Sequence, residues 1–133
     1  RYEIGDVGAM SDLNCSCGRG FPLLKEVKGR ISSTIITSQG RFVHGEYFTH
    51  LFYPIQGVTA FQVHQGSIDA IEVHIQPGNG FDSSVMPPLL SEIKDHLGPE
   101  MAITWHIVEE IPLTPTGKHH FVISDIPVDF VVT

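Results

Sequence analysis

Two stretches with the apolar spacing of helices alternate with stretches of β-type residues, and this order constrains the fold more than any other feature. In residues 46–55 the apolar side chains fall at i, i+3, i+4 and i+7, namely Phe48, Leu51, Phe52 and Ile55. A second stripe of leucine and isoleucine predicts a helix with two prolines in its first turn and a stop at Gly98. Both helices have one apolar face, so each needs a sheet to cover.

The strand-like stretches supply that sheet. We predict strands at residues 31–38 and 41–43, which form a hairpin, and at residues 58–65, 68–76, 101–108 and 121–123. The apolar residues of the second strand pair share one face only if an odd-length loop, residues 66–68, joins them. The predicted class is therefore α+β: a small, mostly antiparallel sheet with two helices on one face, in the order β-hairpin-α-β-β-α-β plus a short terminal strand.

Size and charge exclude several classes of protein. A chain of 133 residues fits one domain, and no apolar run approaches the roughly 18 to 20 residues that a membrane span needs. The net charge of -7 provides no diffuse positive field for a phosphate backbone. We therefore expect neither a membrane nor a nucleic acid as partner.

The two cysteines, Cys15 and Cys17, are separated by a single residue. This spacing is poor for a mutual disulfide and is typical of a reducing compartment, so we expect a cytoplasmic protein. Three interpretations stay open for the pair: thiolate ligands of a structural Zn²⁺, a redox pair, or structural cysteines in a glycine-rich turn. A structural zinc site needs four ligands, so the first interpretation requires two more from elsewhere.

The stretch "PLTPTGKHH", residues 112–120, places one lysine in a loop of proline, threonine and glycine. Gly117 permits a tight turn, and the prolines stiffen the approach to it. Lys118 is thereby available as a point charge for a phosphate or a carboxylate. The alternative is an ordinary solvated lysine, which is the usual state of this residue type.

Three stretches, in order, resemble motifs of the adenylate-forming superfamily. "RYEIGD" (residues 1–6) resembles its Tyr-Arg-Thr-Gly-Asp segment, "KGRISS" (28–33) its Gly-Arg-x-Asp-Asp hinge, and "PLTPTGK" (112–118) its C-terminal lysine signature. "CSCGRG" further resembles the branch of phenylacetate-CoA ligases and their relatives in capsular polysaccharide biosynthesis. The resemblance implies that residues 1–29 are a connector from the end of a missing N-terminal adenylation domain, and that residues 30–133 are the C-terminal lid domain.

The resemblance also implies roles for individual residues. Asp6 would accept hydrogen bonds from the ribose hydroxyls of the nucleotide, and Arg30 would reach the ribose or nearby. Ser32 stands at the hinge position, where the family has aspartate. Lys118 would be catalytic, approaching the α-phosphate and the substrate carboxylate as the acyl-adenylate forms. The arginine that the family has three residues after this lysine is absent, because "HHF" stands there.

The activity implied is that of an ATP-dependent carboxylate-CoA ligase resembling phenylacetate-CoA ligase. It would use ATP, Mg²⁺ and coenzyme A on a small carboxylic acid, such as an aryl acid, and the fragment alone would be inactive. One alternative is the lid of a capsule-related adenylating enzyme with an acceptor other than coenzyme A. Another is a stand-alone regulatory α+β module that binds a ligand, and a homodimer is compatible with each.

Overall fold

The chain divides into two units, residues 1–32 with 128–133 and residues 33–127. The structure, a computed structural model, describes residues 6–30 and 33–127. The predicted boundary between connector and lid, between residues 29 and 30, stays a prediction.

An antiparallel hairpin of β1 (Asp6–Ser11) and β2 (Leu23–Arg30) forms the described part of the first unit. Two shifts of register interrupt the pairing, between Val7 and Gly8 and between Ala9 and Met10. β2 lies where no strand was predicted. Residues 24–27 of β2 are all exposed. The strand therefore lacks the alternation of buried apolar and exposed polar residues by which a strand is predicted from sequence.

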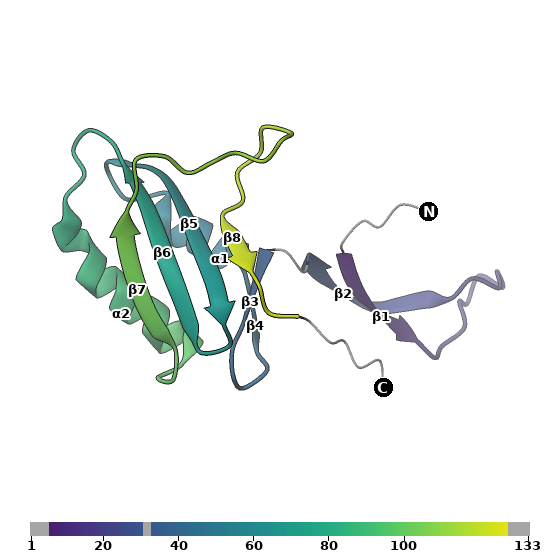
Figure 1. The fold of residues 1–133 in the computed structure, drawn as a ribbon. Helices are drawn as coiled ribbons and strands as arrows, with labels where there is room; N and C mark the ends of the chain where they lie inside the picture. Colours follow the sequence, from purple (N-terminus) through teal and green to yellow (C-terminus); the bar gives the residue numbers. More distant parts are fainter. Residues whose placement is uncertain (1–5, 31–32, 128–133) are drawn as a thin grey trace. The chain divides into compact units, whose positions relative to one another are not determined.

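The second unit contains the expected order of elements (Figure 1). Its helices are α1 (Gly45–Phe52) and α2 (Met86–Leu97), the latter preceded by the 3-10 turn η2 (Ser83–Val85). Its strands are β3 (Thr34–Ile36), β4 (Phe42–His44), β5 (Val58–Ser67), β6 (Ala70–Pro77), β7 (Ala102–Ile107) and β8 (Val122–Ser124). The predicted α+β class is therefore confirmed.

The main sheet is mixed. Its strand order is β7-β6-β5-β8, with β5 antiparallel to β6, while β6 with β7 and β5 with β8 are parallel. Of the five strand pairings in the described residues, three are antiparallel, because β1 with β2 and β3 with β4 are also antiparallel. The β6–β7 pair is parallel because α2 carries the chain back from the end of β6 to the start of β7. After β7 the chain reverses direction once more, so β8 runs parallel to β5.

The β5–β6 hairpin keeps its apolar side chains on one face by a bulge. Phe61 lies opposite Ile75 and Val63 opposite Val73, as the alternation predicted, and all four are buried. The predicted three-residue loop is wrong: Ser67 pairs with Ala70 across a two-residue turn, and the register shifts between Gln65 and Ser67. A two-residue turn alone would place the apolar residues of β5 and β6 on opposite faces. The extra residue of the bulge restores the register that keeps them on one face.

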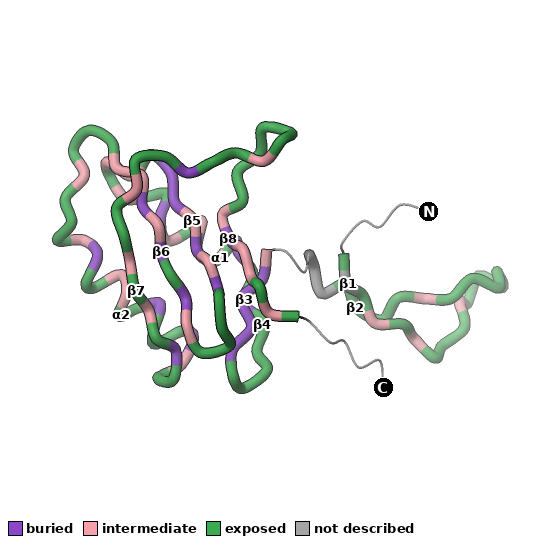
Figure 2. The backbone as a smooth tube through the Cα atoms, viewed as in Figure 1, coloured by how far each residue is buried: buried purple, intermediate pink, exposed green. Residues whose placement is uncertain are grey.

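Both helices lie on the same face of the main sheet, and the core lies between them and the strands (Figures 1 and 2). The fully buried side chains include Phe48 and Phe52 of α1, Met86 and Ile93 of α2, and Val63, Val73 and Ile75 of the sheet. The α1 stripe is confirmed, although the helix ends at Phe52 instead of Ile55. Tyr53 keeps helical geometry, and its N–H donates to the Thr49 carbonyl oxygen at 3.0 Å, but Pro54 has no N–H with which to continue the helical bonds.

Local signals set the limits of α2. Two prolines occupy its first turn as predicted, and Gly98 ends it at a φ of 113°. Before it, the Asp82 carboxylate accepts a hydrogen bond of 2.9 Å from the Ser84 N–H, and bonds from the Ser84 N–H and then its hydroxyl lower the pKa of Asp82. At 12 residues, α2 is the longest helix within residues 6–30 and 33–127, and none there is long and apolar enough to cross a bilayer.

Candidate functional site

Residues 108–121 connect β7 to β8 and carry Lys118; we call this segment the lysine loop (Figure 1). Its first part is tied to the sheet, because the Val108 N–H donates to the Ile75 carbonyl oxygen at 2.9 Å. Ile111 is buried, and its N–H donates to Oε1 of Gln76 at 2.9 Å. The loop therefore leaves the sheet from a fixed position.

The other end of the lysine loop is held by β5. The Val63 N–H donates to the Phe121 carbonyl oxygen at 2.8 Å, and Nε2 of Gln62 donates to the His120 carbonyl oxygen at 2.9 Å. Only the segment between Ile111 and His120 therefore projects from the strands that hold it.

A tight turn forms the tip of this projection. The Thr114 N–H donates to the Lys118 carbonyl oxygen and the Gly117 N–H to the Thr114 carbonyl oxygen, each at 2.8 Å. The Lys118 N–H in turn donates to Oγ1 of Thr114 at 3.0 Å, and Gly117 has a φ of 77°. Thr114 thus bonds both backbone groups of Lys118. Sequence reasoning did not single out this threonine, although a hydroxyl near a proline and glycine turn is a known signal for such bonds.

The Lys118 side chain is exposed. Exposure alone agrees with a solvated lysine as well as with a catalytic one. What distinguishes this lysine is its backbone, which is bonded on both sides by one residue and carried by a loop anchored at both ends.

Asp6 and Arg30, the predicted nucleotide contacts, both belong to the first unit and lie opposite each other in the β1–β2 ladder. Asp6 is exposed. The hairpin therefore brings together two residues that only motif resemblance had connected. Ser32, the predicted hinge residue, lies outside the described residues.

Cys15 and Cys17 lie in the loop between β1 and β2, with their Sγ atoms 2.8 Å apart. The turn is closed by the Gly18 N–H, which donates to the Cys15 carbonyl oxygen at 3.2 Å, and by a φ of 76° at Gly18. A hydrogen bond from the Cys15 thiol, and then one from the Arg19 N–H, lower the pKa of Cys17. Within residues 6–30 and 33–127, no three His, Cys, Asp or Glu side chains are grouped to hold a metal ion.

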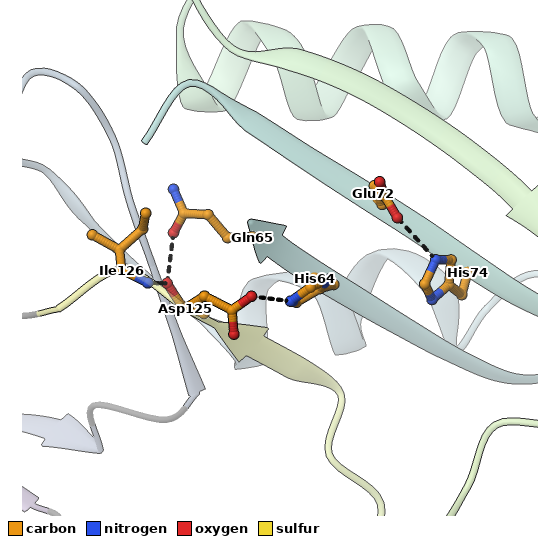
Figure 3. A network of polar contacts seen from close by, with 7 residues as sticks. His64, Gln65, Glu72, His74, Asp125 and Ile126 are labelled. Carbon is orange, nitrogen blue, oxygen red and sulfur yellow. Dashed lines mark hydrogen bonds and ion pairs between the residues drawn. The ribbon is translucent and has the colours of Figure 1, made fainter. Parts of the chain in front are cut away.

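The histidines of the main sheet lie on strand surfaces. Nε2 of His64 is 2.7 Å from Oδ2 of Asp125, and Nε2 of His74 is 3.4 Å from Oε2 of Glu72 (Figure 3). Both histidines alternate with buried residues of their strands, so they lie on the face away from the helices. Each imidazole has a carboxylate as its neighbour.

Two solved structures of "2-Hydroxyisobutyryl-CoA Ligase (HCL) in the postadenylation state" are similar to the chain. They contain 2-HIB-AMP and R3-HIB-AMP, and their sequence identities to the chain are 16% and 15%. Each match has a TM-score of 0.46 over 91% of this chain. The chain spans 28% of the length of these ligase chains.

No curated protein matches the sequence. A family model described as "CapK C-terminal domain" matches residues 35–125, which is more than half of the chain and includes the lysine loop. The match confirms the resemblance to a C-terminal domain of the capsule-related branch. The chain therefore belongs to the family of CapK C-terminal domains.

Proposed function

We propose that the chain is the lid of an ATP-dependent carboxylate-CoA ligase of the phenylacetate-CoA ligase type. In the first step a carboxylate oxygen attacks the α-phosphate of ATP, giving an acyl-adenylate and releasing pyrophosphate. In the second step the thiolate of coenzyme A attacks the acyl carbon, forming the thioester and releasing AMP. The observation that carries the proposal is the doubly anchored loop that presents Lys118 on a closed turn.

Lys118 would act in the first step. The attacking carboxylate and the phosphates are both anionic, so their approach is opposed by charge. An ammonium group held where the two meet offsets that repulsion most in the transition state, when charge is shared between them. Mg²⁺ would enter with the nucleotide phosphates, which are its usual ligands.

Asp6 and Arg30 would hold the nucleotide. An ionised carboxylate only accepts hydrogen bonds, so Asp6 can take protons from two ribose hydroxyls at once. Arg30, its register partner, would supply donors to the same sugar or to a nearby phosphate. Support for this pairing comes from the register of β1 and β2. Ser32, next to this hairpin in sequence, would serve as the hinge.

Cys15 and Cys17 would supply two thiolates to a structural Zn²⁺. The lowered pKa of Cys17 favours its thiolate, the form that binds metal, and Cys15 would lose the proton that it donates to Cys17 when the metal binds. Zinc takes four ligands in structural sites, so the other two would come from outside the described residues.

A second candidate is supported by the family itself. The match to the CapK C-terminal domain agrees with a capsule-related adenylating enzyme whose acceptor is an amine or a sugar hydroxyl in place of coenzyme A. Such an enzyme would use the same lysine in adenylation and would differ only in the second step. Incubating the complete enzyme with an acyl-adenylate and either coenzyme A or an amine acceptor, and measuring AMP release, separates the two.

The test of the Lys118 role uses the complete enzyme that carries this domain, and measures carboxylate-dependent exchange of pyrophosphate into ATP. We expect Lys118→Ala to lower the exchange rate by about 100-fold or more, as when one transition-state donor is removed. Lys94→Ala, at an exposed lysine of α2, is the matched control and should leave the rate unchanged. Exchange at the wild-type rate in Lys118→Ala would show that the lysine has no part in adenylation.

A further inference from the structure

A cavity lies beside the base of the lysine loop, within the second unit. Its volume is about 150 Å³, and it is lined by Phe52, Tyr53, Val58, Thr59, Ala60, Phe61, His119 and Phe121. Phe52 and Phe61 are buried and form its floor, whereas Tyr53 and His119 are exposed and form its rim. Part of the lining therefore belongs to the buried core and part to the lysine loop.

Aromatic rings dominate the lining. Phe121 is central: its ring is stacked on Phe61 with centroids 5.2 Å apart and on His119 at 5.7 Å. Tyr53 meets Phe121 edge-on at 6.1 Å. A ligand in this cavity would contact ring faces and edges, the surroundings that favour another aromatic ring over a saturated one of the same size.

The size of the cavity restricts the ligand. A dry, apolar cavity of about 150 Å³ in another protein holds one benzene molecule, so a volume like this accommodates a single six-membered ring. The fused rings of a purine are larger than benzene. The cavity is thus matched to one ring with a small substituent.

The positive charge of Lys118, next to the cavity rim in sequence, indicates the chemical nature of that substituent. Lys118 precedes the rim residue His119, so their Cα atoms are about 3.8 Å apart. In a chain with a net charge of -7, Lys118 is the sole Lys or Arg after residue 94. The Thr59 and Tyr53 hydroxyls add hydrogen-bond donors to the lining. A carboxylate is the substituent that a positively charged residue next to the rim and neutral donors in the lining would favour.

We propose that this cavity binds a small aryl carboxylate, with its ring between Tyr53, Phe61 and Phe121 and its carboxylate at the mouth beside Lys118. A bound ring would pack against His119 and so restrain the segment that carries the lysine. The site belongs to the lid itself and needs no nucleotide, so it is distinct from the adenylation chemistry proposed above.

Binding is tested on the 133-residue chain by titrating benzoate and following backbone amide signals by NMR. We expect saturable shifts at Thr59, Ala60, His119 and Phe121. Cyclohexanecarboxylate has the same charge and carbon count without aromaticity, and should bind about 2- to 10-fold more weakly. Equal binding of the two acids, or shifts scattered outside the lining, would overturn the proposal.

Three variants locate the site. Tyr53→Ala removes an exposed rim ring and should weaken benzoate binding about 2- to 10-fold, because it deletes one aromatic contact. Ala60→Leu should abolish binding by filling the cavity, with unchanged shifts elsewhere as the check of folding. Ile107→Ala, at a similarly exposed apolar residue outside the cavity, is the control. Unaltered affinity in both Tyr53→Ala and Ala60→Leu would place the ligand elsewhere.

The carboxylate part has its own test. Lys118→Ala should weaken benzoate by up to about 5-fold, the size of an exposed ion pair, and leave the neutral benzyl alcohol unchanged. Equal effects on both ligands would remove the role of charge. These measurements contain no ATP, so their failure would leave the pyrophosphate-exchange result for Lys118 untouched.

Discussion

Replacing Gln65 by leucine should destabilise the second unit through two backbone groups that this side chain bonds. Gln65 is fully buried in β5, and its Nε2 donates to the Ile36 carbonyl oxygen at 2.6 Å. Its Oε1 accepts from the Ile36 N–H at 3.0 Å and from the Ser124 hydroxyl at 2.9 Å (Figure 3 shows the Gln65 side chain). One amide of β5 therefore bonds both β3 and β8.

The magnitude follows from the burial of Ile36. This residue is 8% exposed, so its N–H and carbonyl oxygen have little access to water once the amide is gone. A buried polar group left without a partner costs about 1–3 kcal/mol, which is about 2–6 kcal/mol for the two. Burial of the leucine side chain offsets part of this, and the expected loss is about 2–4 kcal/mol in the free energy of unfolding.

Urea unfolding followed by circular dichroism measures this loss. The matched control is Gln62→Leu on the same strand, whose amide donates to an exposed backbone oxygen of His120. We expect the control to change the free energy of unfolding by less than about 0.5 kcal/mol, as at ordinary surface positions. Equal stabilities for the two variants would mean that water reaches the Ile36 backbone and that the reasoning from burial is incorrect.

A glutamate at position 65 adds a pH dependence of known sign. The carboxyl group must keep its proton to donate to the Ile36 carbonyl oxygen, so its pKa in the folded state is raised above the unfolded value of about 4.3. The Gln65→Glu variant should therefore be most stable below that pH and lose stability as pH rises through the folded pKa. Stability that increased with pH over this range, relative to wild type, would contradict the bonding pattern.

Two further perturbations test local geometry. Gly57 has a φ of 81°, and an added Cβ would collide with the Phe81 backbone nitrogen, so Gly57→Ala should cost about 2–5 kcal/mol in urea unfolding. Gly40→Ala, at a φ of 74° with open space around it, is the control and should cost only about 1–2 kcal/mol; equal losses would rule out the collision. Iodoacetamide should alkylate Cys17 before Cys15, at a pH below that usual for a free thiol, because the pKa of Cys17 is lowered. Mass spectrometry that found both labelled at the same rate would contradict this order.

The elements with a buried face were predictable from the sequence, and β2 shows why that face matters. The stripes of α1 and α2 and the alternation of Phe61 and Val63 identify residues that the structure buries. β2 carries no such pattern, because residues 24–27 are exposed, and it was not predicted. Gln65 carried a signal that was not used: it falls on the same face of β5 as Phe61 and Val63, where a polar residue needs a partner.

The candidate site was also predictable only in part from the sequence. Motif order connected Asp6, Arg30 and Lys118, and the structure adds that the first two are register partners and that Thr114 closes the turn of the third. The ring-lined cavity had no signature in the sequence. Its walls come from α1, β5 and the lysine loop, and the loop residues His119 and Phe121 lie more than fifty residues after the lining residues of α1 and β5.

The sequence alone determined the class of the fold, the order of its elements, the faces of its helices and the family motifs. These depend on contacts between residues a few positions apart, whose spacing is printed in the chain. Tertiary structure alone decided that β7 and β8 pair in parallel with β6 and β5, that Gln65 bonds Ile36, and that an aromatic cavity borders the lysine loop. Each of these is a choice among distant partners, and that choice follows from which surfaces pack together when the whole unit folds.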